Sequence, residues 1–104
     1  MVSENGYCGH VNGGYPTGCW KDNVTSESIC RADCTSNSLC IAYEYDGSFC
    51  GMIQSSNICP DNYVLDNDTL AKKASDIVET NFDSFVCYRK QYGNKSEIVR
   101  IDII

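Results

Sequence analysis

Eight cysteines in a chain of 104 residues are the feature that most limits what this sequence can fold into. A chain this short buries only a modest core, and an even number of thiols allows all of them to form stabilising disulfides. The sequence therefore predicts one small, disulfide-rich domain from an oxidising, extracellular compartment. Spacing alone leaves roughly a hundred ways of pairing the eight thiols open.

Three N-glycosylation sequons agree with a secreted protein; they begin at Asn23, Asn67 and Asn94. The polar segment Met1 to Gly6 has no apolar stretch of the kind found in signal peptides. We therefore expect a mature or recombinant secreted chain, with a cytosolic protein as the alternative.

Charge and composition exclude several classes of partner. Fourteen acidic against eight basic residues give a net charge of -6, which disfavours nucleic acid and anionic membranes. The apolar runs are too short to span a bilayer, so we expect no membrane insertion. The single histidine, His10, has no serine or cysteine nucleophile pattern around it, so the sequence predicts a protein that is not an enzyme and needs no cofactor.

Two metal-site patterns are weak. Cys30, Cys34 and Cys40 could supply zinc thiolates, but the cysteine content favours structural bridges and no metal. The run Asp66 to Asp68 lacks the glycine and glutamate of a calcium loop, and we interpret it as an acidic helix N-terminus.

Local patterns predict a mixed α+β chain. A helix from Glu27 to Thr35, capped by Thr25 or Ser26, places two cysteines four residues apart on one face. Residues 40–45 and 48–53 alternate in polarity around Asp46-Gly47, a strong hairpin signal. The remaining expected elements are a short strand at Tyr7-Cys8, a second helix from Asp68 to Thr80, a closing strand from Ser84 to Tyr88 and a strand in the tail from Glu97 to Ile104.

The motif Cys30-x3-Cys34-x5-Cys40-x-Ala42-Tyr43-x-Tyr45, followed by Phe49-Cys50-x-Met52, resembles the PAN/apple domain family. Ser26 before the helix also matches the family pattern. Met52 stands where the family usually has Leu, a conservative change in a core. The resemblance is specific from Ser26 to Ile53 and looser from Cys8 to Cys87.

The resemblance implies both a fold and a disulfide pairing. The fold is an antiparallel sheet of four or five strands, with the first helix packed across it above Ala42 through Ile29, Cys30 and Cys34. The second, short helix lies beside it. We therefore expect a PAN/apple-like domain over residues 1–92. The resemblance does not cover the tail after Tyr92, and we expect residues 93–104 to add a further edge strand. The implied bridges are Cys8–Cys87, Cys30–Cys50 and Cys34–Cys40, which leaves Cys19 and Cys59 to pair with each other.

Aromatic residues beside carboxylates suggest where a ligand binds. Tyr43 or Tyr45, Phe49, Phe82 and Phe85 are expected in the core. Rings that stack on sugar C–H faces, with nearby carboxylates or amides that bond hydroxyls, are typical of lectins. The candidate binding residues are Asn12, Tyr15, Trp20, Asp22, Glu44, Tyr45 and Asp46.

The resemblance implies a non-enzymatic adhesion module that binds carbohydrate or glycoprotein. The alternative is a secreted signalling protein, such as a pheromone, toxin or effector, that acts on a cell-surface receptor. Five large apolar residues among the last eight also predict that the tail pairs as a strand, within the domain or between two copies in a homodimer.

Overall fold

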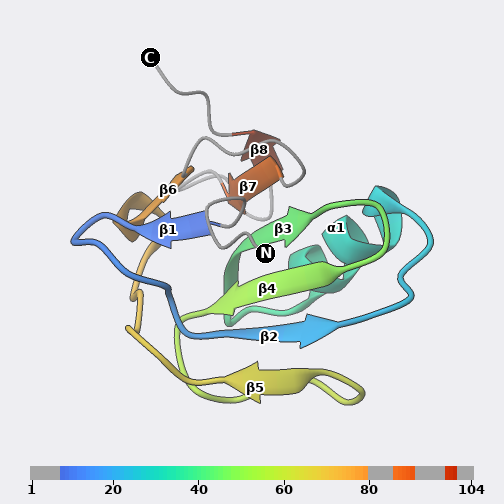
Figure 1. Cartoon of the computed structure of the whole chain (residues 1–104), viewed down its shortest axis with the longest axis horizontal. Helices are drawn as coiled ribbons and strands as arrows, with labels where there is room; N and C mark the ends of the chain where they lie inside the picture. The colour runs from blue at the N-terminus through green and yellow to red at the C-terminus, as the bar shows by residue number, and fades with distance from the viewer. Residues whose placement is uncertain (1–7, 80–85, 91–97, 101–104) are drawn as a thin grey trace.

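The structure is a computed structural model that describes residues 8–79, 86–90 and 98–100, the last three by their backbone (Figure 1). Within these residues, six strands form an antiparallel sheet in the order β5-β2-β4-β3-β7-β8, and β1 and β6 form a second sheet. The strands are β1 (Cys8–His10), β2 (Gly18–Lys21), β3 (Cys40–Tyr45), β4 (Cys50–Gln54), β5 (Val64–Asp66), β6 (Ile77–Glu79), β7 (Val86–Lys90) and β8 (Ile98–Arg100). The helices are α1 (Glu27–Ser36) and the 3-10 helix η2 (Ala74–Asp76). None of the described helices is long and apolar enough to cross a membrane.

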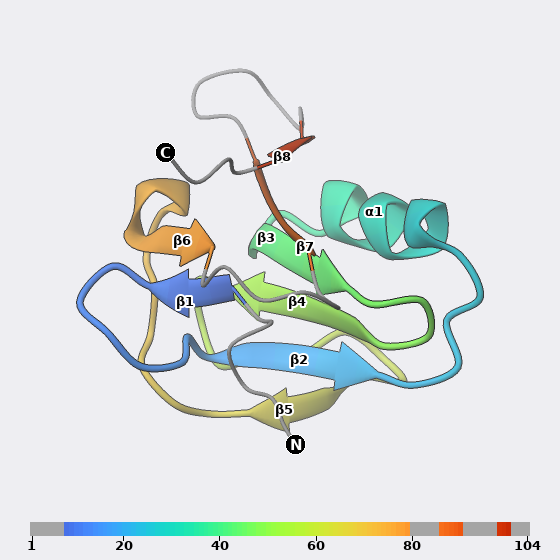
Figure 2. The same cartoon turned by 45° about the horizontal axis from the view of Figure 1, so that its top comes forward.

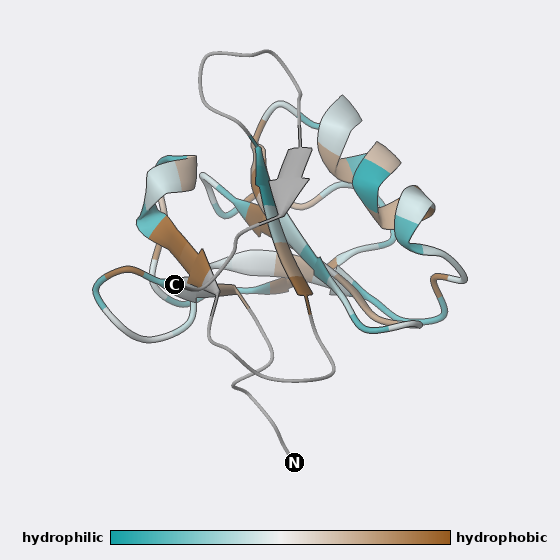
Figure 3. Cartoon of the chain, turned by 90° about the horizontal axis from the view of Figure 1, so that it is seen from above, coloured by the Kyte–Doolittle hydropathy of each residue, from teal (hydrophilic) through white to brown (hydrophobic). Residues whose placement is uncertain are grey.

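The large sheet lies between α1 on one face and the β1–β6 pair on the other (Figure 3). Cross-strand partners point to the same face, so the register separates the side chains. Tyr43 is opposite Met52, and both pack on the α1 side. Ala42 is opposite Ile53, and both pack on the β1–β6 side. The prediction that α1 covers Ala42 is wrong, because alternation along β3 turns this residue to the other face.

The helix α1 begins at Glu27, one residue after the N-cap position Ser26, and is attached to the sheet by its cysteines. The described contacts include no hydrogen bond from the Ser26 side chain to the helix backbone. Cys30 and Cys34 are fully buried, whereas Ile29 is 42% exposed. The expectation that Ile29 packs on the sheet is wrong, because the two bridged cysteines orient the helix and leave Ile29 on its outer side.

The predicted second helix is absent from residues 68–79, which contain an extended segment, η2 and β6. The apolar residues of this segment have helical spacing, but the segment forms hydrogen bonds with other parts of the chain instead of a helix. Thr69 exchanges backbone hydrogen bonds with Tyr15 and Thr17, and β6 pairs with β1. The β-branched Ile77 suits that strand and is fully buried, while Leu70 is 40% exposed. Tertiary pairing therefore overrides the local helical pattern.

Other elements differ in extent from the prediction. The large sheet has six strands, where the sequence predicted four or five. Strands β2 and β5 were not predicted. The hairpin return strand begins at Cys50, two residues later than expected, and β1 and β7 end at His10 and Lys90. The tail adds an edge strand, because β8 pairs with β7 (Figure 2). Tyr7, Ser84, Phe82 and Phe85 and the ends of the tail lie outside the described residues.

All eight cysteines form disulfides, with Cα–Cα distances of 5.1–5.7 Å. Cys30–Cys50 and Cys34–Cys40 attach α1 to β4 and β3, and Cys8–Cys87 joins β1 to β7 across the opposite face. Cys19–Cys59 ties β2 to the loop before β5. These are the pairs that the family resemblance implied.

Candidate functional site

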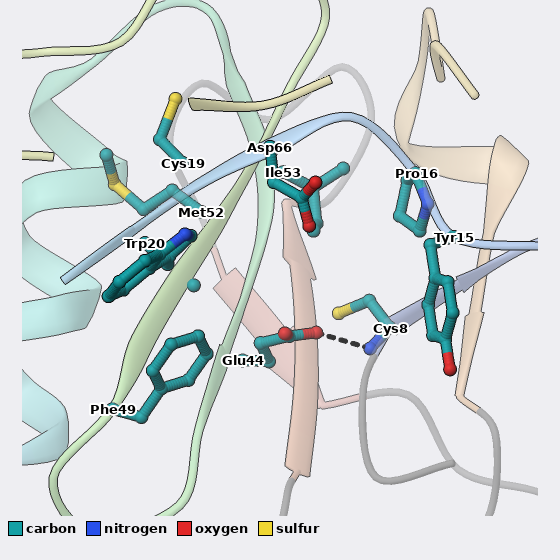
Figure 4. Close-up of a pocket in the computed structure, with 12 residues that line it drawn as sticks. Cys8, Tyr15, Pro16, Cys19, Trp20, Glu44, Phe49, Met52, Ile53 and Asp66 are labelled. Atoms are coloured by element: carbon teal, nitrogen blue, oxygen red, sulfur yellow. Dashed lines mark hydrogen bonds between the residues drawn. The ribbon is translucent and has the colours of Figure 1, made fainter. Parts of the chain in front are cut away.

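A pocket of about 360 Å³ lies on the face opposite α1, where the β1–β6 pair leaves part of the large sheet uncovered. Its volume is within the range typical of small-ligand sites, about 300–1,000 Å³. The sheet side of the pocket comes from β2, β3 and β4, and the segment before β2 closes one end (Figure 4). The lining residues used below are Tyr15, Trp20, Glu44, Phe49, Gly51 and Asp66.

Two aromatic side chains form one wall. The rings of Trp20 and Phe49 stack with centroids 5.7 Å apart and planes 28° apart. Trp20 lies in β2 directly opposite Gly51, and Phe49 comes just before β4, so strand pairing brings them together. Both side chains are half-buried, which leaves ring surface facing the pocket. Phe49 is therefore not the core residue that the sequence predicted.

Tyr15 and Pro16 stand at the other end of the pocket, with the Glu44 carboxylate between the two ends (Figure 4). Asp66 lies at the end of β5 and adds a second carboxylate to the lining. The pocket thus has aromatic and apolar ends and acidic groups between them.

Glu44 is held at the centre by its backbone surroundings. It is only 6% exposed, and its Oε1 accepts a hydrogen bond of 2.5 Å from the backbone N–H of Cys8. A Cβ on Gly51 would come within 2.9 Å of Glu44 Cγ and Oε2, so the side chain occupies the space that this glycine leaves open. Burial raises the pKa of the Glu44 carboxyl well above its usual value; the Cys8 N–H opposes this, and Asp46 and Asp66 raise the pKa further.

Three of the predicted binding residues, Tyr15, Trp20 and Glu44, line this pocket together. Tyr45 points to the α1 side, where its hydroxyl donates to the Val24 carbonyl at 2.6 Å. Asp46 shapes the hairpin turn, because its Oδ1 accepts the N–H groups of Ser48 and Phe49.

The other two candidates also lie elsewhere. Asp22 is exposed, and Asn12 is exposed in the turn after β1, where its N–H donates to Nδ1 of the buried His10. Neither side chain lines the pocket.

Sequence reasoning missed Phe49, Gly51 and Asp66. They come from β4, its preceding turn and the unpredicted β5, and they meet Trp20 only after β2 pairs with β4 and β5. Successive residues of the predicted strand 40–45 point to opposite faces of the sheet. The sequence alone could therefore have shown that Glu44 and Tyr45 do not belong to the same site. Asp66 ends a strand, and the interpretation of Asp66 to Asp68 as a helix N-terminus is wrong.

A second, more polar depression of about 560 Å³ lies beside the end of α1. Three of its lining side chains contact one another: the Tyr63 hydroxyl donates to Asp33 at 2.8 Å, and Lys21 Nζ lies 5.1 Å from the centre of the Tyr63 ring. Burial and the Asp33 carboxylate raise the pKa of Tyr63. We therefore interpret these residues as packing around the end of α1 and not as a ligand site.

Among residues 8–79, 86–90 and 98–100, no group of three or more His, Cys, Asp or Glu side chains could hold a metal ion. Two of the sequon asparagines are described. Asn23 is exposed, and Asn67 is exposed with its Oδ1 accepting from the Thr17 hydroxyl at 3.3 Å. Asn94 lies outside the described residues.

The pocket can offer ring faces and carboxylate acceptors to a small polar ligand. In comparisons with protein-family models, curated proteins and solved structures, the chain has no match, so the geometry of this pocket carries the functional argument.

Proposed function

We propose that this chain is a secreted, PAN/apple-like binding module that recognises carbohydrate, free or on a glycoprotein, in the pocket beside Trp20. The observation that carries the proposal is the Trp20–Phe49 stack placed next to the Glu44 carboxylate. Ring faces cover the apolar C–H surface of a sugar, and a carboxylate accepts hydrogen bonds from its hydroxyls.

The rest of the molecule supports a binding role over a catalytic one. Every cysteine is in a disulfide, so none is a free thiol nucleophile. His10 is buried in β1 and accepts a backbone hydrogen bond. Four bridges are also compatible with an extracellular protein, where disulfides persist.

A glycan array followed by calorimetry with the best ligand tests the proposal. We expect saturable sugar binding that Trp20→Ala weakens roughly tenfold or more, because an aromatic side chain that stacks on the ligand contributes about 1.4 kcal/mol or more. Tyr45→Phe is the matched control, since Tyr45 is a predicted site aromatic that faces α1, and it should leave the affinity unchanged.

An array without any sugar signal would overturn the carbohydrate proposal. Retrieval of a cell-surface receptor that still binds after deglycosylation would then favour the signalling alternative. A Trp20→Ala protein that is folded by its circular dichroism spectrum and binds the sugar normally would place the site elsewhere.

A further inference from the structure

The charges around the pocket are all of one sign within the described residues. Glu44 and Asp66 line it, and no lysine, arginine or histidine does. Asp46 adds a third negative charge that acts on Glu44 from the β3–β4 turn. Burying the Glu44 carboxylate without a counter-charge is costly, so a ligand that brings positive charge gains more here than a neutral one.

The Glu44 carboxylate has capacity left for such a group. Oε1 accepts from the Cys8 N–H, whereas Oε2 has no hydrogen-bond donor in the part of the chain that the structure describes. Oε2 lies over Gly51, beside the Trp20–Phe49 wall (Figure 4). Ring faces also attract cations, so the wall and the carboxylate favour the same kind of ligand.

We infer that the ligand carries a protonated amine, which binds Glu44 while its carbon skeleton lies against Trp20 and Phe49, and that the Asp66 carboxylate adds to the attraction from β5. This inference rests on the proposed function and narrows it to sugars with a free amine, over their neutral N-acetylated forms and over acidic sugars.

Proton linkage gives the inference a distinctive signature. In the free pocket, burial favours the protonated, neutral form of Glu44. An ammonium ion favours the carboxylate, so binding expels a proton from Glu44. Binding therefore tightens as the pH rises towards the pKa of this group, over the pH range in which the amine of the ligand is itself protonated.

Four other ionisable groups on the neighbouring strands have contacts of their own. Lys21 on β2 lies over the Tyr63 ring, and Lys90 on β7 donates to the Asn37 carbonyl at 2.9 Å. His10 on β1 accepts from Asn12, and Arg89 on β7 donates to the Ile77 carbonyl at 3.3 Å. Asp46 and Asp66 are the remaining charges that act on Glu44.

The test compares sugars that differ only in this nitrogen: deacetylated against fully acetylated chitotriose, and galactosamine against N-acetylgalactosamine, by calorimetry from pH 5 to 8. We expect the amine form to bind roughly tenfold or more tightly near neutral pH, with proton release in buffers of different ionisation enthalpy. Glu44→Gln should abolish this preference, and Asp66→Asn should reduce it. Asp22→Asn, which removes the same charge outside the pocket, should leave it unchanged.

The outcomes separate the inference from the proposed function. Equal affinity for the amine and N-acetyl forms would overturn the inference and keep carbohydrate binding. Binding of a simple alkyl diamine as tightly as of the amino sugars would uphold the amine and overturn carbohydrate as the ligand class. A preference that survives in both Glu44→Gln and Asp66→Asn would overturn the inference directly.

Discussion

Glu44 shows how one buried side chain couples folding to pH. Its side chain is 6% exposed and lies between the Cys8 N–H and Gly51 at the wall of the pocket, and its pKa in the folded chain is well above the ordinary value of 4.5. The folded state therefore holds the Glu44 proton over a pH range in which the unfolded chain has released it. The contribution to stability is fully present below pH 4.5 and is lost as the pH rises through the pKa of the folded state.

Glu44→Gln tests this linkage, because glutamine keeps the shape and does not titrate. We expect the free energy of unfolding of the native chain, relative to the variant, to fall as the pH rises from 4.5 towards the folded pKa and then to level off. Urea unfolding at a series of pH values measures the difference, and Asp22→Asn serves as the exposed control. Parallel pH profiles for the native chain and Glu44→Gln would contradict the burial of a protonated carboxyl.

Strand β3 separates two cores by its alternation. Tyr43 contributes to the core under α1, where its hydroxyl donates to Glu27, and its ring stacks on Tyr88 at 4.8 Å. Ala42 contributes to the core under β1 and β6, with Ile53 and Ile77. Each core is thin, so the size of a single residue matters.

Ala42→Leu should therefore destabilise the domain by about 1–3 kcal/mol, because a fully buried alanine leaves no space for three more carbons. Ile29→Ala on the exposed side of α1 is the comparison and should change stability by less than about 0.5 kcal/mol. Chemical denaturation measures both. Equal effects would mean that α1 and β3 do not present the faces described above.

The sheet ends in β5 on one side and β8 on the other, and such edges can pair with another chain. Two apolar residues of β5, Val64 and Leu65, are 51% and 41% exposed.

The homodimer that the sequence predicts, formed through the tail, remains a prediction. We expect dimers at high micromolar concentration that are lost when residues 97–104 are deleted. Light scattering measures the mass; a native chain that is already monomeric would contradict the dimer.

Local signals predicted the elements that form locally. The helix at Glu27 and the turn at Asp46-Gly47 are encoded within a few residues, and both are present. Strand β2 has four residues, and its partners in β4 lie some thirty positions away, so its existence depends on pairing that no short window contains. The pocket could not be predicted for the same reason, because Trp20 contacts Phe49 only when β2 pairs with β4.

Four cross-links carry the stability of the whole domain to different degrees. Cys8–Cys87 spans 79 residues and Cys34–Cys40 spans 6. In the chain-entropy account, closing the long loop contributes about 4 kcal/mol and the short one about 2 kcal/mol.

Replacing both members of each pair by serine should therefore destabilise the domain about twice as much for Cys8–Cys87 as for Cys34–Cys40. Thermal unfolding of the two double variants measures the order, and non-reducing peptide mapping verifies that the remaining bridges are native. A larger loss from the short bridge would show that its role in fixing α1 outweighs the loop entropy.

Cys8 serves the protein twice, and the two roles cannot be separated. Its sulfur anchors β1 to Cys87, and its backbone N–H is the donor that holds the Glu44 carboxylate. A reductant that opens this one bond removes the anchor of the strand that supplies the donor, so the pocket loses its preorganised acceptor. At the proposed site, we therefore expect reduction of Cys8–Cys87 to weaken ligand binding.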